Sequence, residues 1–289
     1  MSGYAHPEVL VSTDWVKNNL GKPRIKLVEV DVDTKAYDAG HIEGAIGFNW
    51  QTQLQDQITR DIISKEALEE LLGSHGISNQ DTVVLYGDNN NWFAAYAFWL
   101  LKVYGHRDAL LMDGGRVKWL NEADKALTTE PPRVVPARYV ASSPDLSLRA
   151  RVQDVLQVVR TGSDNLVDVR SPDEFTGKVM APPGLSETAQ RAGHIPGAKS
   201  VPWSTAVRPD GTFKSADELR KVYLDNAGVD SSRPTIAYCR IGERSSHTWF
   251  VLKYLLGLND VRNYDGSWTE YGSMIGMPIE RMEPEPARS

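Results

Sequence analysis

The sequence predicts an α/β protein of two tandem domains, each with a central, mostly parallel sheet flanked by helices. Two observations lead to this prediction: motifs of the first half recur in the second half, and short β-branched segments alternate with helical segments in each half. Strands that alternate with helices usually form a parallel sheet that is covered on both faces. The length of 289 residues is also sufficient for two domains.

Four short motifs recur in the same order in the two halves of the chain. The matching pairs are 27–31 with 166–170, 39–45 with 192–198, 81–86 with 233–238, and 112–115 with 264–267. The offset is 139 residues at the first pair (166 − 27), 153 at the second (192 − 39) and 152 thereafter (238 − 86). The second repeat therefore contains an insertion, which we place at residues 178–191.

The repeat and a proline-rich segment predict the domain boundaries. Residues 125–149 show little helical periodicity and contain several prolines, so we expect an extended linker there. The predicted domains are residues 1–124 and 150–289.

Three helices stand out within them. The first covers residues 65–72 between Ser64 and Gly73, and the others cover residues 216–223 and 249–256.

Composition and charge are those of a soluble globular protein. The chain has 41% hydrophobic and 24% charged residues, and its net charge of −6 argues against a nucleic-acid or anionic-membrane partner. We find no signal-peptide pattern near the N-terminus, and the most apolar run, residues 93–101, is about half as long as a membrane span. A single cysteine fits a reducing compartment, so we expect a cytoplasmic protein. The histidines show no metal-ligand spacing, and neither a metal nor another cofactor is predicted.

The single cysteine, Cys239, is the leading candidate for a catalytic residue. It ends the strand-like run 235–238 and precedes a short polar loop and a helix. Ligands of open parallel sheets bind at such positions, beyond the carboxyl ends of the strands. The helix start and two arginines, Arg240 and Arg244, are expected to lower the pKa of the thiol. We therefore predict a reactive thiol in preference to an inert core cysteine.

The residues that follow Cys239 are predicted to form an anion-binding loop. Arg240 and Arg244 supply positive charge, which Glu243 partly offsets unless it serves the helix N-terminus. Gly242 is expected to adopt a positive φ so that the loop can curl around an atom. Ser245 is expected to cap the helix.

The first repeat lacks this chemistry at the matching positions. Gly87 stands opposite Cys239, and Asp88 and Trp92 stand opposite the two arginines. We therefore predict one active and one inert repeat. His41 and His194 occur in both repeats and are expected to brace a turn. His247, close to the cysteine loop, is a weaker candidate for a catalytic base than for a structural residue.

The repeated motifs resemble those of the rhodanese family, the thiosulfate sulfurtransferases. Residues 192–198 and 261–271 resemble the two characteristic segments of the family, and they flank a cysteine loop of matching length. The resemblance covers nearly the whole chain as two tandem rhodanese-like domains. The loop sequence Cys-Arg-Ile-Gly-Glu-Arg at residues 239–244 looks like that of the actinobacterial-type enzymes.

The resemblance implies a two-step sulfur transfer. Cys239 would attack thiosulfate and become a persulfide, and cyanide or a thiol would then remove the sulfur; a thioredoxin-like reductant is a further candidate partner. The backbone N–H groups of residues 240–245, including that of Ile241, would cradle the terminal sulfur. Arg244 would bind the anionic end of the donor. Many relatives place a donor-binding arginine where Glu174 stands, so Arg240 or Arg191 is expected to assist here.

Three alternatives remain open at this point. A 3-mercaptopyruvate sulfurtransferase is less favoured, because a dianion such as thiosulfate gains more from two arginines than a monocarboxylate does. A phosphatase is disfavoured, because only four residues lie between Cys239 and Arg244, fewer than in the phosphatase loop. A noncatalytic binding module is disfavoured, because the second repeat keeps both its thiol and its cations.

Overall fold

The computed structural model describes residues 3–122, 124–181 and 187–282, and the chain forms two compact units. The N-terminal unit comprises His6–Leu146 and Val207–Lys214, and the C-terminal unit comprises the rest of the chain. These limits differ from the predicted boundaries at 1–124, 125–149 and 150–289. The segment predicted as a linker belongs largely to the N-terminal unit, and so does the short segment 207–214 from the second repeat.

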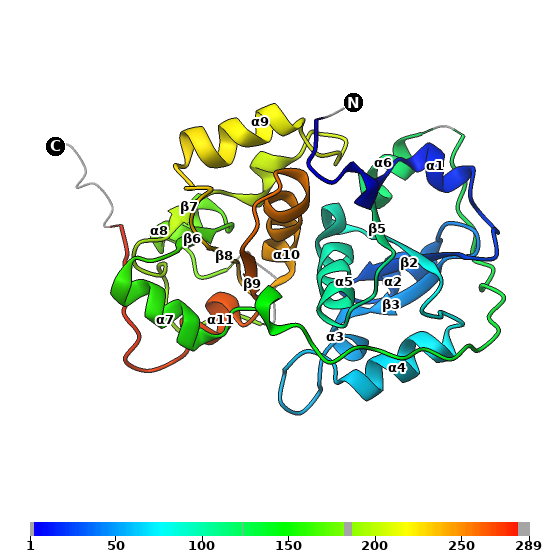
Figure 1. The fold of residues 1–289 in the computed structure, drawn as a ribbon, viewed down its shortest axis with the longest axis horizontal. Coiled ribbons are helices and arrows are strands. Elements are labelled where there is room, and N and C mark those ends of the chain that lie inside the picture. The colour runs from blue at the N-terminus through cyan, green and yellow to red at the C-terminus, as the bar shows by residue number, and fades with distance from the viewer. Residues whose placement is uncertain (1–2, 123, 182–186, 283–289) are drawn as a thin grey trace. The chain divides into compact units, whose positions relative to one another are not determined.

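Each unit contains one sheet whose paired strands all run parallel, as Figure 1 shows. The strand order is β1-β5-β4-β2-β3 in the N-terminal unit and β7-β6-β8-β9 in the C-terminal unit. The strands are β1 Leu10–Val11, β2 Ile25–Asp31, β3 Ile46–Asn49, β4 Thr82–Tyr86, β5 Ala109–Met112, β6 Asn165–Asp168, β7 Lys199–Ser200, β8 Thr235–Tyr238 and β9 Val261–Tyr264. The predicted fold class is confirmed.

Helices follow most of the strands and separate them along the chain. The α-helices of the N-terminal unit are α1 Thr13–Lys17, α2 Lys35–Ala39, α3 Trp50–Gln53, α4 Lys65–Ser74, α5 Trp92–Val103 and α6 Gly115–Asn121. Those of the C-terminal unit are α7 Val152–Thr161, α8 Pro172–Thr176, α9 Ala216–Arg220, α10 Glu243–Phe250 and α11 Ser267–Tyr271. Helices α9 and α10 continue as wider π-helical turns, Lys221–Asn226 and Val251–Leu255. No helix of the described residues has the length and apolar character that a membrane span requires.

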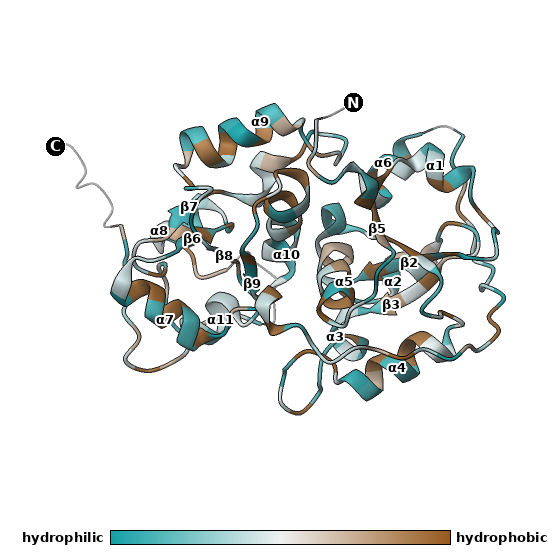
Figure 2. Cartoon of the chain, viewed as in Figure 1, coloured by the Kyte–Doolittle hydropathy of each residue, from teal (hydrophilic) through white to brown (hydrophobic). Residues whose placement is uncertain are grey.

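The alternation of side chains along each strand explains why helices cover both faces of the sheets. In β4, Val84 and Tyr86 pack in a cluster with Val16 of α1 and Trp119 of α6, and the side chains between them point to the opposite face. In the C-terminal unit, Ile236 and Tyr238 of β8 pack with residues of α7 and α11, whereas α10 packs against β8 and β9. Figure 2 shows that apolar and polar residues also follow one another along helices α4 and α9.

The helix predicted at residues 65–72 is α4, and Ser64 caps it by accepting a hydrogen bond from Ala67 N–H (3.2 Å). The predicted end at Gly73 is wrong, because the helix continues to Ser74. Gly73 is instead a point of close approach, where a Cβ would lie 2.8 Å from the carbonyl oxygen of Ala137. Ala137 N–H donates to Gly73 O (2.9 Å), so the extended chain that follows the first repeat is bound to α4.

The segment 207–214 is bound to the N-terminal unit by side-chain and backbone contacts. Phe213 N–H donates to Asp113 Oδ1 (2.9 Å), and Asp210 pairs with Lys118 (3.3 Å). Gly211 lies against Gly114, where a Cβ would come within 2.9 Å of a carbonyl oxygen. These contacts explain why a short segment of the second repeat belongs to the unit of the first repeat.

The two histidines shared by the repeats brace a turn, as the sequence predicts. His41 Nδ1 lies 3.0 Å from Tyr37 O, and the two rings stack at 3.9 Å. His194 Nδ1 lies 2.8 Å from Phe175 O, and those rings stack at 3.6 Å. Both histidines therefore fix the chain after a short helix.

A buried arginine ties the same turn in both repeats, although it comes from different positions. Arg116 of α6 donates to Glu29 Oε1 (2.6 Å) and to Gly40 O (2.5 Å). Arg170, two residues after the end of β6, donates to Asp168 Oδ2 (2.6 Å) and to Gly193 O (2.7 Å). Because each carboxylate is buried, removal of its arginine would leave an uncompensated charge in the core.

We therefore expect Arg116→Ala to destabilise the protein by about 3–5 kcal/mol, because it leaves Glu29 buried and unpaired. Urea unfolding followed by tryptophan fluorescence measures this change as a lower transition midpoint. Arg107→Ala is the matched control, because Arg107 pairs with Asp108 at the surface with 86% of its side chain exposed. The control should leave the midpoint unchanged, and equal midpoints for the two variants would contradict the prediction.

Candidate functional site

The candidate site lies where β8 ends and α10 begins, at residues 239–244. Gly242 is the residue before the first turn of α10 and has φ 101°, so the predicted positive φ is confirmed. A Cβ at this position would lie 2.9 Å from the Cα of Asp265. Two backbone hydrogen bonds hold the loop against α11, from Trp268 N–H to Cys239 O (3.1 Å) and from Thr269 N–H to Arg240 O (3.0 Å).

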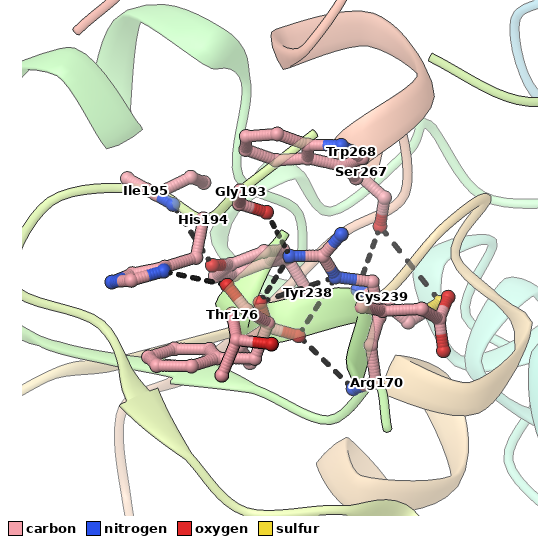
Figure 3. A network of polar contacts seen from close by, with 12 residues as sticks. Arg170, Thr176, Gly193, His194, Ile195, Tyr238, Cys239, Ser267 and Trp268 are labelled. Atoms are coloured by element: carbon pink, nitrogen blue, oxygen red, sulfur yellow. Dashed lines mark hydrogen bonds and ion pairs between the residues drawn. The ribbon is translucent and has the colours of Figure 1, made fainter. Parts of the chain in front are cut away.

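The Cys239 thiol is fully buried and surrounded by polar groups. Gly242 N–H donates to the sulfur at 3.1 Å, and Glu243 Oε2 lies 3.2 Å from it. Ser267 Oγ accepts a hydrogen bond from Cys239 N–H (3.0 Å) and lies 3.9 Å from Sγ. Figure 3 shows Ser267 reaching from α11 toward Cys239 at the end of β8. A sulfur that receives an N–H at the start of a helix is in a position that favours negative charge.

The pKa of the Cys239 thiol is nevertheless raised, so the expectation of a lowered pKa is wrong. Burial is the largest cause, because it disfavours the thiolate, and the negative charge of Glu243 acts in the same direction. The charge of Arg244 and hydrogen bonding from Ser245 lower the pKa but do not compensate. The sequence indicated the cations of the loop. It did not indicate that the sulfur is fully buried or that the Glu243 carboxylate points toward it.

Arg244 is bound by carboxylates within the protein. Its Nη atoms donate to the two oxygens of Glu174 (2.9 and 3.1 Å), and its Nε lies 3.5 Å from Glu243 Oε1. Glu174 is fully buried on α8 and also accepts hydrogen bonds from Ser171 N–H and Oγ (both 3.0 Å). Glu174, at the position where the resemblance implies a donor-binding arginine, is therefore the partner of the arginine expected to bind the donor.

Burial alone would raise the pKa of Glu174, but its contacts reverse the direction. Hydrogen bonds and charge from Arg244, a hydrogen bond from Ser171 and the charge of Arg170 hold the pKa of Glu174 below its ordinary value. Glu174 is therefore a carboxylate at neutral pH and forms a buried ion pair that joins α8 to α10.

Arg240 lies at the other side of the loop and is 6% exposed. One Nη donates to the carbonyl oxygen of Glu187, and the other lies 3.9 Å from Glu243 Oε1. Its Nε–H has no hydrogen-bond partner within the described part of the chain. The proposed insertion at 178–191 lies partly outside the described residues, since 182–186 are not included.

The expectation that Ser245 caps the helix is wrong, because α10 begins at Glu243 with Gly242 as its cap. Two serines and an asparagine instead support the loop from behind. Ser245 Oγ lies 3.1 Å from Gly242 O and 2.7 Å from Asn263 Oδ1, both acceptors for its single proton, and Ser246 Oγ donates to Gly242 O (2.7 Å). Asn263 Nδ2 in turn donates to Ser246 Oγ (2.8 Å). The carbonyl of Gly242 is thereby fixed, and its N–H stays aimed at the thiol. Ile241 is 2% exposed, so of this residue the backbone alone is suited to bind a substrate.

Two further residues that the sequence suggested for the site are His247 and Arg191. His247 is fully buried, its ring meets Trp203 edge-on at 5.8 Å, and burial lowers its pKa to about 3, so it is neutral. Arg191 donates to Gly272 O (3.0 Å) and to Met274 O. Arg191 therefore holds the chain at the end of α11 through Nε and Nη2, and its predicted part in donor binding stays a prediction.

The structure places Ser267, a residue without a predicted role in the site, beside the thiol. Ser267 has φ 52°, which is uncommon for a residue other than glycine. Its counterpart in the first repeat, at the offset of 152, is Gly115 (267 − 152), which has φ 53°. A serine where the other repeat has glycine at a strained position was the signal that could have identified it.

The first repeat fills the corresponding loop with a side chain of its own. Asn91, the counterpart of Glu243, accepts a hydrogen bond from Gly87 N–H (3.0 Å) and donates to Met112 O (2.7 Å). A Cβ at Gly115 would lie 2.2 Å from Asn91 Oδ1, and a Cβ at Gly87 would lie 2.3 Å from Val30 O. Neither the cysteine nor the serine of the second repeat fits there, so this loop is closed to the same chemistry.

Comparison with known proteins identifies the family. The model of the rhodanese-like domain matches residues 12–122 and 151–274, one match in each repeat. The chain therefore belongs to the family of proteins built from rhodanese-like domains, with two such domains in tandem. This agrees with the resemblance seen in the sequence.

Relatives of similar length share more than half of the sequence. A protein of Saccharopolyspora erythraea named "Putative thiosulfate sulfurtransferase" is 57% identical over 282 residues, covering 97% of this chain and 99% of its own. The "Sulfur carrier protein TtuD" of Thermus thermophilus is 54% identical over 285 residues, covering 97% and 99%. The structure of SseA from Escherichia coli, described as a 3-mercaptopyruvate sulfotransferase, has a TM-score of 0.76 at 25% identity and covers 90% of this chain and 98% of its own.

The buried ion pair of Glu174 predicts a pH-dependent stability. Its pKa in the folded protein lies below the ordinary 4.5, so the folded state binds fewer protons than the unfolded state in this range. The stabilisation is therefore present above pH 4.5 and is lost as the pH falls through the folded pKa. We expect Glu174→Gln to lower the unfolding free energy at pH 7 by about 3 kcal/mol and to flatten its decline in acid.

Denaturant unfolding at pH 7 and at several acidic pH values measures both effects. Asp173→Asn on the same helix is the control, because its side chain is 55% exposed and pairs only with Lys178 among the described residues. If Glu174→Gln retained the full acid sensitivity of the wild type, Glu174 would not be the group responsible.

Proposed function

We propose that this protein is a sulfurtransferase that carries sulfur as a persulfide on Cys239, with thiosulfate as the donor. The observation that carries the proposal is the position of the thiol. Its sulfur lies at the end of a parallel strand and accepts the Gly242 N–H at the start of α10 (3.1 Å). Relatives named for sulfur transfer or sulfur carriage match nearly the whole chain, which supports the same reaction class.

The proposed reaction has two steps and returns the cysteine to its starting state. The Cys239 thiolate attacks the outer sulfur of thiosulfate, the sulfur–sulfur bond of the donor breaks, and sulfite leaves with the electron pair. The persulfide anion is stabilised by the N–H groups of the loop and the positive end of α10. A nucleophilic acceptor, cyanide or a thiol, then attacks the outer sulfur and releases the Cys239 thiolate, which gives ping-pong kinetics.

The choice of thiosulfate rests on the relatives and on Arg240. The charge argument from the sequence is weaker than expected, because Glu174 and Glu243 face Arg244, and Glu243 also faces Arg240. Arg240 keeps one buried N–H without a partner among the described residues, and an anionic donor would satisfy it. Arg240 is therefore proposed as the donor-binding cation, with Arg244 contributing charge from its ion pair.

A 3-mercaptopyruvate sulfurtransferase is the second candidate. Its support is the likeness to SseA over 90% of this chain, together with a loop whose two cations are faced by two carboxylates. The two carboxylates repel a donor with a single negative charge less strongly than they repel a dianion. For the acceptor, a thiol or a thioredoxin-like protein is proposed alongside cyanide. The name of the Thermus relative, a sulfur carrier protein, is compatible with transfer to another protein.

Treatment with thiosulfate should add the mass of one sulfur atom to Cys239, because the proposed first step leaves a persulfide there. Intact-protein and peptide mass spectrometry locate the added atom. Cys239→Ser should show no gain and no sulfur transfer to cyanide, while its circular dichroism stays that of the wild type. Absence of any mass gain in the wild type after thiosulfate and after 3-mercaptopyruvate would exclude this sulfur-carrying function.

The donor is tested by comparing kcat/KM for thiosulfate and for 3-mercaptopyruvate with cyanide as the common acceptor. We expect the wild type to favour thiosulfate. Arg240→Gln should reduce kcat/KM for thiosulfate about tenfold, since it removes a charged hydrogen-bond donor. Arg233→Gln is the control, because Arg233 is held by main-chain carbonyls near residue 163, and it should not change the preference. A higher kcat/KM for 3-mercaptopyruvate in the wild type would replace the first candidate by the second.

A further inference from the structure

The carboxylate of Glu243 touches every charged or reactive group of the cysteine loop. Its Oε2 lies 3.2 Å from Cys239 Sγ, and its Oε1 lies 3.5 Å from Arg244 Nε and 3.9 Å from Arg240 Nη2. The residue is 1% exposed, so these contacts are little screened by water. A substrate that enters the loop therefore meets the sulfur, both cations and this carboxylate together.

We infer that Glu243 restrains the site: its carboxylate holds the resting Cys239 as a thiol and reduces the positive charge that an anionic sulfur donor meets. The inference rests on the proposed function, because it concerns the residue that would accept sulfur. Glu243 is then a residue that determines both reactivity and donor specificity. The sequence assigned it only to the substrate-binding loop or to the helix N-terminus.

The effect on the thiol follows from hydrogen bonding and charge. A carboxylate within 3.2 Å of the sulfur accepts the S–H and is repelled by a thiolate, so the protonated form is favoured. Burial and the charge of Glu243 both raise the pKa of Cys239. The Gly242 N–H and Arg244 act in the opposite direction, as does hydrogen bonding from Ser245.

The other charged groups around the loop are already paired. On α8, Glu174 binds Arg244 (2.9 Å). Behind Gly242, Asp265 accepts two hydrogen bonds from Arg149 (both 2.7 Å).

Next to β8, the Asp168 carboxylate binds Arg170, whose guanidinium lies 4.6 Å from the Trp268 ring centre. On α10, His247 is neutral, since burial lowers its pKa to about 3. On α11, the Ser267 hydroxyl donates to Tyr264 O (2.6 Å). Glu243 is thus the ionisable group within hydrogen-bond distance of the sulfur among the described residues.

The effect on the donor follows from the charge balance of the loop. Two arginines, Arg240 and Arg244, are faced by two carboxylates, Glu174 and Glu243. Replacing Glu243 by a neutral residue leaves one net positive charge at the place where the donor binds. A dianion interacts with that charge about twice as strongly as a monoanion at the same distance, so the donor preference should shift toward thiosulfate.

The first repeat supports a role for Glu243 that depends on the thiol. Its counterpart there is Asn91, which is neutral and bonds to the backbone of its own loop. Where the cysteine is replaced by Gly87, the carboxylate is absent as well. A residue needed only to start the helix would have been equally useful in both repeats.

The test is the variant Glu243→Gln, which keeps the size of the side chain and removes its charge. We expect its Cys239 to react with iodoacetamide at pH 7 about tenfold faster than the wild type, because more of it is thiolate. The rate should be measured across pH by mass spectrometry of the alkylated protein. If the thiol ionises more easily, the curve of alkylation rate against pH shifts to lower pH. If iodoacetamide only reaches the thiol more easily, the rate increases by the same factor at every pH.

Two further variants separate charge from structure. Glu243→Asp keeps a carboxylate and should retain the slow alkylation, and Asp217→Asn removes an equal charge from α9, where the side chain is 98% exposed, without changing the rate. In steady-state assays, Glu243→Gln should raise the ratio of kcat/KM for thiosulfate to that for 3-mercaptopyruvate about threefold or more, in line with the added charge.

Alkylation does not require sulfur transfer, so the two proposals can fail separately. If Glu243→Gln shows an unchanged or a slower alkylation curve while Cys239 still takes sulfur from thiosulfate, the restraining role is wrong and the proposed function stands. If alkylation is faster but no sulfur is accepted from either donor, Glu243 restrains the thiol and the proposed function is wrong. A faster rate equal at every pH would indicate altered access and would also overturn the inference.

Discussion

The buried ion pair between Glu174 and Arg244 is the interaction on which the cysteine loop depends. It joins α8, which follows β6, to α10, which follows β8, and so fixes the start of α10 relative to the neighbouring strand. The first turn of α10 supplies both the Gly242 N–H and the Glu243 carboxylate that meet the sulfur. A displacement of this turn would change both contacts together, so the ion pair determines the electrostatic surroundings of the thiol. Its members are buried, and each would be destabilising without the other.

Much of the fold could be predicted from the sequence because the chain is duplicated. The repeat located equivalent strands, and the alternation of strands and helices predicted parallel sheets. The domain limits were less accessible, because the attachment of residues 125–146 and 207–214 to the N-terminal unit depends on tertiary contacts such as Ala137 with Gly73 and Phe213 with Asp113. Local composition does not encode such contacts.

The candidate site shows the same division between local and tertiary information. The position of Cys239 after a strand and the positive φ of Gly242 could be predicted from local patterns. The ionisation of the thiol could not, because it depends on complete burial and on a carboxylate that points toward the sulfur. The partner of Arg244 was equally hidden, since Glu174 lies 70 residues away in the sequence (244 − 174). Ser267 could have been predicted only by comparison with Gly115, the residue at the equivalent strained position of the other repeat.

The segment 207–214 determines how the repeat that lacks a thiol is connected to the cysteine-bearing unit. Between β7 and α9 the chain leaves the C-terminal unit, adds a short piece to the N-terminal unit and returns. Neither unit is therefore one continuous stretch of sequence, and no single cut in the chain or in the gene yields two complete halves. A deletion of the first repeat would strand Phe213 and Asp210 without their partners, next to the start of a helix of the cysteine-bearing unit. Because of this connectivity, the repeat that lacks a thiol cannot be separated from the cysteine-bearing unit as a complete unit by one cut.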